Sequence, residues 1–385
     1  MALREGFTTG SAATAAAMAA FARLLGAEVQ EFVSCPLPPF EETDDGILFP
    51  AGRLDIPISS VMLHEKNNSV RALVIKDGGD DPDATHQAGI EAEVALCPAE
   101  HLLPHEGEIF LPGPPPLVLR GGRGIGRVTL PGLPVAVGEP AINPVPRKQI
   151  LAGLKEVAAQ YACKAGLVVT LSVPNGESIA RKTLNPRLGI LGGISILGTH
   201  GTVRPYSHDA WKASILEGLS VAQAVNCPRI LLTTGRRSER LLNGLFPHER
   251  EQAFVQVADF AEFSLRSAVE SGFRDIIWGC FFGKLVKLAQ GQGHTHAHSA
   301  PLDMNRLALW CAESASQGAS DLKQAIAACT TANQALDLIL PRPDAMKILH
   351  SLAQKAKHVA ESFAPGASVR LYLFSLDDDK ELLHL

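Results

Sequence analysis

Residues 174–205 read PNGESIARKTLNPRLGILGGISILGTHGTVRP and lie between a strand-rich half of the chain and a half in which helices and strands alternate. Six glycines stand among isoleucine and leucine residues, whereas a flexible linker would be rich in serine and poor in branched apolar side chains. We expect the apolar residues to anchor this glycine-rich stretch in a core. The glycines would then form turns whose backbone a ligand can approach closely, so the stretch predicts a binding site.

The half before the glycine-rich stretch has the pattern of an α+β fold. Its first helix is rich in alanine and apolar on all sides, so we expect it to be buried. The N-terminus of this helix is either capped by Thr8, Thr9 or Ser11 or is a seat for a carboxylate or phosphate group. The pattern predicts helices at 11–25 and 147–162, strands at 69–77, 89–97, 107–112, 127–132 and 166–174, and proline-rich interruptions at 34–57 and 111–116.

The half after the glycine-rich stretch alternates as parallel α/β sheets do. The pattern predicts helices at 209–225, 238–246, 253–272 and 283–290 and strands at 229–235 and 275–280. At 385 residues the chain is also too long for one ordinary core. We therefore expect an α+β domain with substrate motifs over residues 1–200, followed by an α/β domain with a mostly parallel sheet and a cofactor crevice over residues 201–385.

Composition limits the kinds of partner. A formal net charge of -5 offers no basic surface for nucleic acid. No segment has the character of a signal peptide or a membrane span, so we expect a cytoplasmic protein without a membrane partner. Seven scattered cysteines without a C-x-x-C pair argue against a zinc knuckle or a disulfide framework. His294, His296 and His298 alternate in a loop-like context without an acidic or cysteine neighbour, so no metal site is expected.

Two glycine motifs resemble nucleotide-binding sequences but fail in detail. GGRGIG at 121–126 has Arg127 where the last glycine of the dinucleotide motif belongs, and GCFFGK at 279–284 lacks one residue and has Leu285 in place of a hydroxyl. A nucleotide-dependent kinase is therefore disfavoured. A glycine turn after a strand remains, with TTG at 233–235 as its counterpart, and we expect a ligand crevice there.

Polar residues gather in four clusters, at 76–87, 138–148, 174–187 and 198–209. The acidic first cluster either binds a cation or substrate N–H groups or is ordinary turn chemistry. Basic residues of the glycine-rich stretch either bind a ligand with several carboxylates or solvate the surface.

Several blocks in a fixed order resemble the cobalt-precorrin-5B C-1 methyltransferases of cobalamin biosynthesis. These blocks are FTTGSAATAAAMAA, DDPDATH, GGRGIGRVTLPGLPVAVGEPAINPVPR, the glycine-rich stretch, and GKLVKLAQG with THAHS. The resemblance spans most of the chain and implies transfer of a methyl group from S-adenosylmethionine to C-1 of a ring-contracted tetrapyrrole, giving cobalt-precorrin-6A. Cobalt enters only as part of the substrate. An N-terminal α+β domain and a C-terminal α/β domain are also implied.

The chain departs from that family at two places. Ala12 stands where the family usually has cysteine, which excludes a catalytic thiol there. Phe281 and Phe282 stand where members commonly have a histidine before GK, so we assign no proton-transfer role to that turn.

For methyl transfer we expect carboxylates and imidazoles near the sulfonium, and cations, hydroxyls and glycine turns around the substrate's carboxylate arms. The expected catalytic residues are Asp80, Asp81, His86, Glu139 and Glu177. The expected substrate-binding residues are Thr8, Thr9, Arg147, Asn175, Arg181, Lys182, Arg187, Gly192, Gly193, Ser195, Thr199, His200 and Arg204. The expected cofactor-binding residues are Thr234, Gly235, Gly283 and Lys284.

Some alternatives stay open. A non-catalytic protein that binds or channels a corrin intermediate would use the same charged clusters but would not bind S-adenosylmethionine. The chain is either a monomer or a homo-oligomer. We expect the glycine-rich stretch to line a cleft between the domains against the macrocycle, and Gly193→Val to impair methyl transfer more than folding.

Overall fold

The computed structural model describes residues 3–28, 30–43, 48–65, 68–296 and 301–385. The chain divides into two compact units, Met1–Ser207 and His208–Leu385, and each has its own core of buried apolar side chains. The expectation from the sequence places the boundary at residue 200. Within the described residues, no helix combines the length and the apolar character that crossing a membrane requires.

The first unit is built on a six-stranded sheet. Its strands follow the order β4-β5-β6-β10-β8-β7, and all neighbours are antiparallel except β10 and β8. Buried and more exposed residues alternate along β5, β6 and β10, so one face of the sheet meets the core. The strands are β4 (Ser60–His64), β5 (Ser69–Ile75), β6 (Gly89–Cys97), β7 (Ile109–Leu111), β8 (Leu117–Gly121) and β10 (Gly166–Ser172).

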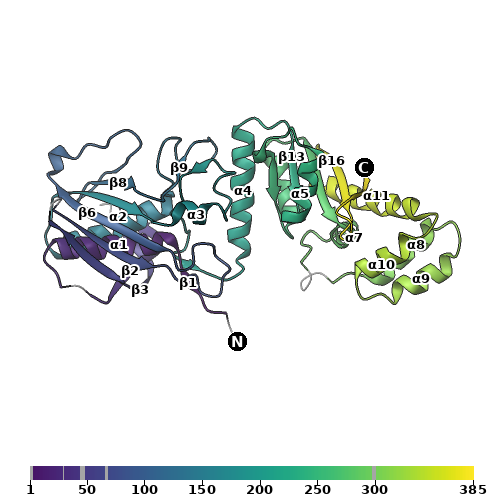
Figure 1. The fold of residues 1–385 in the computed structure, drawn as a ribbon, viewed down its shortest axis with the longest axis horizontal. Helices are drawn as coiled ribbons and strands as arrows, with labels where there is room; N and C mark the ends of the chain where they lie inside the picture. Colours follow the sequence, from purple (N-terminus) through teal and green to yellow (C-terminus); the bar gives the residue numbers. More distant parts are fainter. Residues whose placement is uncertain (1–2, 29, 44–47, 66–67, 297–300) are drawn as a thin grey trace. The chain divides into compact units, whose positions relative to one another are not determined.

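Two helices cover this sheet. Helix α1 (Thr9–Leu24) packs on β5 and β6 and lies beside α2 (Pro144–Gln160), as Figure 1 shows. Small side chains allow this close contact, since a Cβ at Gly153 of α2 would lie 2.6 Å from the Met18 sulfur. The expected burial of the alanine-rich helix is confirmed, because its residues from Thr9 to Met18 are all buried.

Two described parts of the proline-rich segment, 34–42 and 48–57, are strands and not interruptions. They form most of an antiparallel ribbon of β2 (Phe32–Glu42) and β3 (Leu48–Pro57), with an irregularity between Leu37 and Phe40. In a two-stranded ribbon each strand has one free edge, so a proline there need not remove a ladder hydrogen bond. The expected interruption at 111–116 is confirmed, since it separates β7 from β8.

The glycine-rich stretch contains α3 (Gly176–Ala180) and, after it, joins distant parts of the unit through two short strand pairs. Strand β11 (Ile190–Leu191) pairs with β9 (Arg127–Val128), and β12 (Thr202–Val203) pairs with β1 (Gly6–Phe7). The unit also contains a short 3-10 helix, η2 (Ala99–His101).

Three segments of backbone meet at Gly124. A Cβ at Gly176 would lie 2.0 Å from the Gly124 carbonyl oxygen, and a Cβ at Gly193 would lie 2.1 Å from the same atom. Gly192 differs, because it is exposed, has a positive φ of 83°, and has nothing within 4 Å of its Cβ position. Contrary to the expectation from the sequence, this geometry predicts that Gly193→Val impairs folding, and Gly192 is the open glycine of this turn.

We predict that Gly193→Ala lowers the free energy of unfolding by roughly 3 kcal/mol, the upper end of the usual cost of overpacking, because the methyl group meets rigid backbone. Urea unfolding followed by circular dichroism measures this. Gly52→Ala is the control, since a Cβ there has nothing within 4 Å. Equal stabilities of the two variants would contradict the packing argument.

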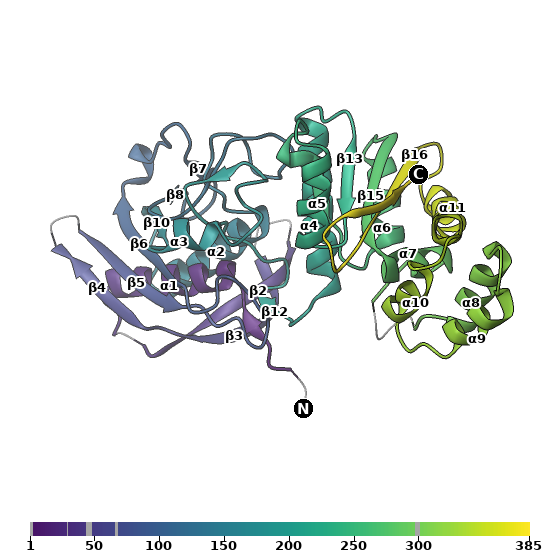
Figure 2. The same cartoon turned by 45° about the vertical axis from the view of Figure 1, so that its right-hand side comes forward.

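The second unit contains a five-stranded sheet in the order β14-β13-β15-β16-β17, parallel except for the β16–β17 pair (Figure 2). The chain moves from β13 to β14 in one direction and then back past β13 to β15. Right-handed crossovers therefore place α5 and α6 on opposite faces. The strands are β13 (Ile230–Thr233), β14 (Phe254–Gln256), β15 (Asp275–Phe281), β16 (Ser368–Phe374) and β17 (Glu381–His384).

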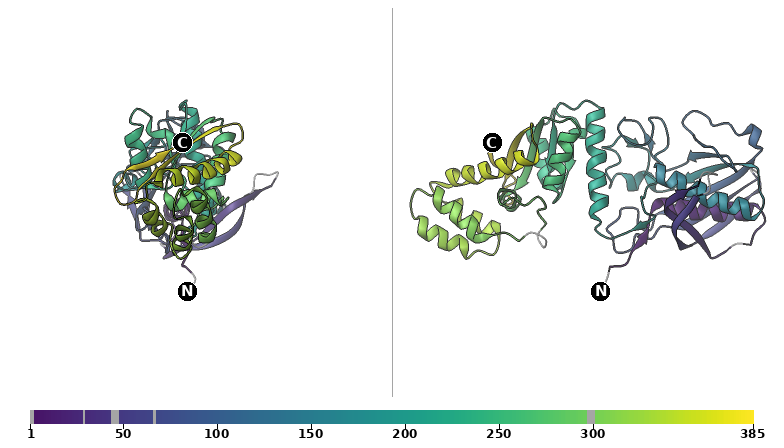
Figure 3. Two further views of the ribbon diagram at one scale, coloured as in Figure 1. Left: turned by 90° about the vertical axis from the view of Figure 1, so that its right-hand side faces the viewer. Right: turned by 180° about the vertical axis from the view of Figure 1, so that it is seen from behind.

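The expected parallel strands are confirmed, but the expected helix at 253–272 is wrong in its first part. That segment begins with β14, which is short and buried, and only then forms α6. Four helices and two strands beyond residue 300 have no counterpart in the sequence analysis; Figure 3 shows the yellow-green helices among them beside α11. The helices are α4 (His208–Ala224), α5 (Arg236–Leu245), η3 (Glu251–Ala253), α6 (Ala261–Glu270), α7 (Phe282–Ala289), α8 (Met304–Ser314), α9 (Ala319–Ala327), α10 (Ala332–Ile339) and α11 (Ala345–Phe363).

Candidate functional site

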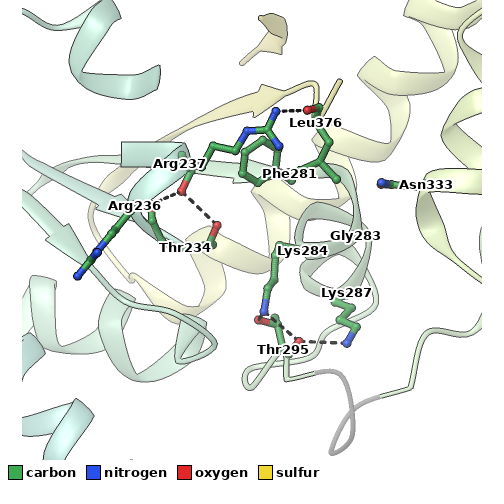
Figure 4. Close-up of a pocket in the computed structure, with 12 residues that line it drawn as sticks. Thr234, Arg236, Arg237, Phe281, Gly283, Lys284, Lys287, Thr295, Asn333 and Leu376 are labelled. Atoms are coloured by element: carbon green, nitrogen blue, oxygen red, sulfur yellow. Dashed lines mark hydrogen bonds between the residues drawn. The ribbon is translucent and has the colours of Figure 1, made fainter. Parts of the chain in front are cut away.

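A pocket of about 470 Å³ opens at the carboxyl ends of the parallel strands in the second unit (Figure 4). Its walls come from the turns after β13 and β15 and from Leu376 after β16. The chain leaves β13 and β15 toward opposite sides of the sheet, so the pocket lies at the point where the strand order reverses. Open α/β sheets bind ligands at such points.

The four expected cofactor-binding residues, Thr234, Gly235, Gly283 and Lys284, all line this pocket. The pocket also contains residues that the sequence analysis did not mark, namely Arg236, Arg237, Ser238, Phe281, Lys287, Thr295, Asn333 and Leu376. Strand–turn–helix patterns identify the first group, whereas Thr295, Asn333 and Leu376 come from segments far along the chain.

Two lysines on α7 give the pocket a basic wall. The Lys284 ammonium contacts the Asp259 carboxylate and donates to the Thr295 hydroxyl (3.2 Å), and Lys287 donates to the Thr295 carbonyl (3.0 Å). Burial and then the nearby Lys287 charge lower the pKa of Lys284 to about 8, while the Asp259 carboxylate acts in the opposite direction. Burial also lowers the pKa of Lys287.

Arg237 and Phe281 line the side of the pocket opposite the two lysines. The Arg237 guanidinium pairs with Asp379 at 2.6 Å and lies 5.7 Å from the centre of the Phe281 ring. Thr234 and Ser238 hydroxyls lie 3.4 Å apart. These contacts hold side chains that line this wall of the pocket.

An aromatic cluster lies close to the basic wall. The ring of Phe260 is 5.3 Å from His208 and 5.0 Å from His294, and His296 stacks on His294. Burial and then the neighbouring His208 lower the pKa of His294. Within the described ranges, no group of three or more His, Cys, Asp or Glu side chains could hold a metal ion, and His298 lies outside those ranges.

In the first unit, the expected catalytic residues of the acidic turn bond to neighbouring backbone. The Arg4 N–H donates to Asp80 (2.7 Å), the Tyr206 N–H donates to Asp81 (2.9 Å), and the Gly78 N–H donates to His86 Nδ1 (3.0 Å). The structure thus brings together the clusters at 76–87 and 198–209.

Two carboxylates of this turn are held in ion pairs. The Arg4 guanidinium lowers the pKa of Asp77 to about 2. Lys76 is buried, only 1% exposed, and its ammonium lies 2.5 Å from Asp83. Burial raises the pKa of Asp83, but the Lys76 charge and the hydrogen bonds from Thr85 outweigh burial and hold that pKa below its ordinary value.

Other expected residues pair along the surface. Glu139 and Arg147 form a half-buried pair at 2.6 Å, while Glu177 and Arg181 form an exposed pair at 3.5 Å. The remaining expected partners of the substrate lie in different surroundings. Arg204 faces Glu5 at 3.3 Å, Thr199 lies 2.9 Å from His200, Asn175 and Lys182 are exposed, Arg187 is half-buried, and Ser195 is buried.

The N-terminus of α1 is occupied by the protein itself. The Ser11 N–H donates to the Thr8 hydroxyl (3.2 Å), and the Gly10 N–H donates to the Leu197 carbonyl (3.2 Å). The Thr9 hydroxyl accepts from the Leu197 N–H at 2.9 Å. Of the two roles that the sequence left open, the structure supports capping over an anion seat.

Comparisons with known proteins agree over nearly the whole chain. Residues 1–205 match the family described as CbiD, and residues 294–384 match the family described as CbiD, C-terminal domain. The chain belongs to the CbiD family. It is 52% identical over 378 residues to the cobalt-precorrin-5B C(1)-methyltransferase of Nitratidesulfovibrio vulgaris, covering 98% of this chain and 91% of that protein.

Two further CbiD relatives are more distant. The cobalt-precorrin-5B C(1)-methyltransferase of Priestia megaterium is 44% identical and covers 88% of this chain and 84% of its own length. The crystal structure of the cobalamin biosynthesis protein CbiD from Archaeoglobus fulgidus is 28% identical, with a TM-score of 0.37, and the match covers 74% of this chain and 78% of that one.

The buried Lys76–Asp83 pair of this CbiD chain yields a stability prediction. We expect Lys76→Met to lower the free energy of unfolding by about 3 kcal/mol at pH 7, because it leaves a carboxylate without its partner. The Asp83 pKa is lower in the folded state, so its contribution is present above about pH 4 and is lost as the pH falls through the folded value.

Urea unfolding at pH 7 and near pH 3 therefore checks the pair. The difference between wild type and Lys76→Met should shrink at the lower pH, and Lys76→Met combined with Asp83→Asn should be more stable at pH 7 than Lys76→Met alone. A difference that is the same at both pH values would exclude the ion pair as its cause.

Proposed function

We propose that this chain transfers a methyl group from S-adenosylmethionine to C-1 of cobalt-precorrin-5B and so forms cobalt-precorrin-6A. The observation that carries this proposal is the 52% identity, over 98% of the chain, to a protein named as a cobalt-precorrin-5B C(1)-methyltransferase. Cobalt belongs to the tetrapyrrole substrate.

Methyl transfer from a sulfonium to a carbon is an in-line displacement, and alignment supplies much of its acceleration. The conjugated macrocycle makes C-1 electron-rich, so no nucleophilic side chain is needed. The protein must hold two ligands in register and exclude water. Its tasks are therefore to bind carboxylates and to shape the two binding surfaces.

We place the methyl donor in the pocket of the second unit. S-adenosylmethionine supplies the electrophilic methyl group and carries an α-carboxylate and two ribose hydroxyls. The pocket offers matching donors. The Lys287 ammonium has three N–H bonds and donates to the Thr295 and His296 carbonyls, and the Thr234 hydroxyl lies at the strand end. Lys284 adds positive charge, and Gly235 leaves room beside the backbone, with nothing within 4 Å of its Cβ position.

We place the tetrapyrrole's contacts on the exposed part of the glycine-rich stretch. Gly192 is exposed, and Leu191 (52% exposed) and Leu197 (48% exposed) of the same stretch offer apolar side chains to a ligand. Arg181 and Lys182 are exposed nearby in sequence and can meet acetate and propionate arms. In this proposal, the other polar residues of the stretch contact the substrate as well, namely Arg187, Arg204, Asn175, Thr199 and His200.

The remaining expected residues act in this proposal as positioning residues. Asp80 and Asp81 tie the acidic turn at 76–87 to Arg4 and to Tyr206, which follows the glycine-rich stretch, and His86 accepts a hydrogen bond from Gly78 within that turn. Thr8, Thr9 and Ser195 hold α1 against that stretch, Glu139 orients Arg147, and Glu177 lies beside Arg181.

The direct test is the reaction itself. Purified protein, S-adenosylmethionine and cobalt-precorrin-5B under anaerobic conditions should yield a product heavier by one methyl group. Absence of that mass gain, with tetrapyrrole binding retained and no affinity for S-adenosylmethionine in calorimetry, would instead identify a protein that only binds or channels the intermediate.

We predict that Lys287→Met weakens binding of S-adenosylhomocysteine by about 10-fold or more, because a charge-assisted hydrogen bond to the carboxylate is lost. Calorimetry measures the dissociation constant. Lys323→Met, which changes an exposed lysine on α9, should leave it unchanged. Equal affinity of the two variants would show that Lys287 does not bind the carboxylate of the ligand.

We also predict that Arg181→Ala combined with Lys182→Ala raises KM for the tetrapyrrole about 10-fold, with a larger effect at low salt, because two cations that meet carboxylates are lost. The affinity for S-adenosylhomocysteine should not change. Arg23→Ala, at the exposed end of α1, is the control. An unchanged KM would place the carboxylate arms elsewhere.

A further inference from the structure

Asp259 is a carboxylate beside the pocket that the sequence analysis did not mark. It follows β14, the strand next to β13, in the turn before α6. Its Oδ1 atom contacts the Lys284 ammonium and accepts from the Thr295 hydroxyl (3.3 Å), while its backbone carbonyl accepts from the Thr295 N–H (2.8 Å). Asp259 therefore stands directly behind two residues that line the pocket.

The Asp259 carboxylate retains capacity for a ligand. The two side-chain contacts just described are both made by Oδ1. A carboxylate can accept about four hydrogen bonds through its two oxygens. The side chain is 21% exposed, so it is not sealed in the core. The Lys284 charge beside it favours the ionised form, which is the stronger acceptor.

The topology places this carboxylate where a nucleoside would need it. Adjacent strands lie about 4.8 Å apart, so the carboxyl ends of β13 and β14 are neighbours. Gly235 provides the open turn after β13, and Asp259 provides the acid after β14. In dinucleotide-binding sheets, the glycine turn after the first strand and an acid about 20 residues further on bind the phosphates and a ribose hydroxyl of one ligand.

Local backbone geometry supports a fixed orientation for Asp259. The preceding residue, Ala258, has a φ of 49°, in the left-handed region that favours glycine. The Val257 N–H donates to the Thr233 carbonyl at 2.8 Å and ties the turn to the end of β13. The surrounding structure thus holds an unfavourable conformation that directs the chain after β14 toward Lys284 and Thr295.

We propose that Asp259 accepts a hydrogen bond from a ribose hydroxyl of S-adenosylmethionine, and that Lys284 positions this carboxylate. This inference rests on the donor site proposed above and identifies which part of the donor the β14 side of the pocket binds. The proposal also predicts that the site discriminates against a ligand with a phosphate on the ribose, because that phosphate would lie beside the negative Asp259 carboxylate.

Ligands that lack one hydroxyl test the proposal. Calorimetry compares S-adenosylhomocysteine with its 2′-deoxy and 3′-deoxy forms on wild type, Asp259→Asn and Glu262→Gln, the last being a nearby carboxylate paired with Arg266 on the surface of α6. In wild type and in Glu262→Gln, one deoxy form should bind about 10- to 100-fold more weakly than the parent ligand.

In Asp259→Asn that penalty should largely disappear, because the acceptor that the hydroxyl used has lost its charge. A full penalty in Asp259→Asn, or no penalty for either deoxy form in wild type, would overturn the proposal. A role for Asp259 only in bracing Thr295 predicts weaker binding of all three ligands by the same factor, which also overturns it.

Two controls keep the outcomes distinct. Circular dichroism checks that Asp259→Asn folds. If it does not fold, Asp259→Glu replaces it, because this variant moves the carboxylate by one methylene and should still reduce the penalty for the deoxy ligand. An undiminished penalty in Asp259→Glu would overturn the proposal. If wild type methylates its substrate and binds S-adenosylhomocysteine without a deoxy penalty, only the role of Asp259 fails. If wild type binds no S-adenosylhomocysteine, the proposed donor site fails with it.

Discussion

The contact of three backbone segments at Gly124 is the constraint on which the first unit depends. Gly176 and Gly193 approach the Gly124 carbonyl so closely that no side chain fits at either position. This contact joins the turn after β8 to two parts of the glycine-rich stretch, the start of α3 and the turn at Gly193. Because the stretch is held there, its next parts can reach the N-terminus of α1 and pair with β1. Backbone packing thus positions polar groups that lie far apart in sequence.

Sequence could predict that these glycines matter but not which role each has. A glycine that lets a ligand approach and a glycine that lets another backbone segment approach look the same in the sequence. The distinction depends on what faces the missing Cβ, and that is a tertiary property. Gly192 faces open space, Gly193 faces Gly124, and a Cβ at Gly198 would meet the Thr8 side chain. Periodicity and turn chemistry carry none of this information.

The pocket shows where pattern reasoning succeeds and where it stops. A strand, a glycine turn and a helix in succession predicted Thr234, Gly235, Gly283 and Lys284 at one sheet edge, and they line one pocket. Asp259 was missed because residues 253–272 have the apolar spacing of one long helix. The segment instead begins with a three-residue strand, β14, which is too short for its period to register. Thr295 and Leu376 were beyond reach, since only the folded sheet brings them to this edge.

The departures from the family pattern also become interpretable in physical terms. Ala12 is fully buried in α1, so that position faces the core, and the absence of a thiol there removes no group from a surface that a ligand could reach. Phe282 is likewise buried, but Phe281 lines the pocket and packs under Arg237. Of the two phenylalanines before Gly283, only Phe281 changes the pocket surface, where it offers an apolar aromatic face. In-line methyl transfer needs no proton donor, so the absence of a histidine at this turn is compatible with methyl transfer.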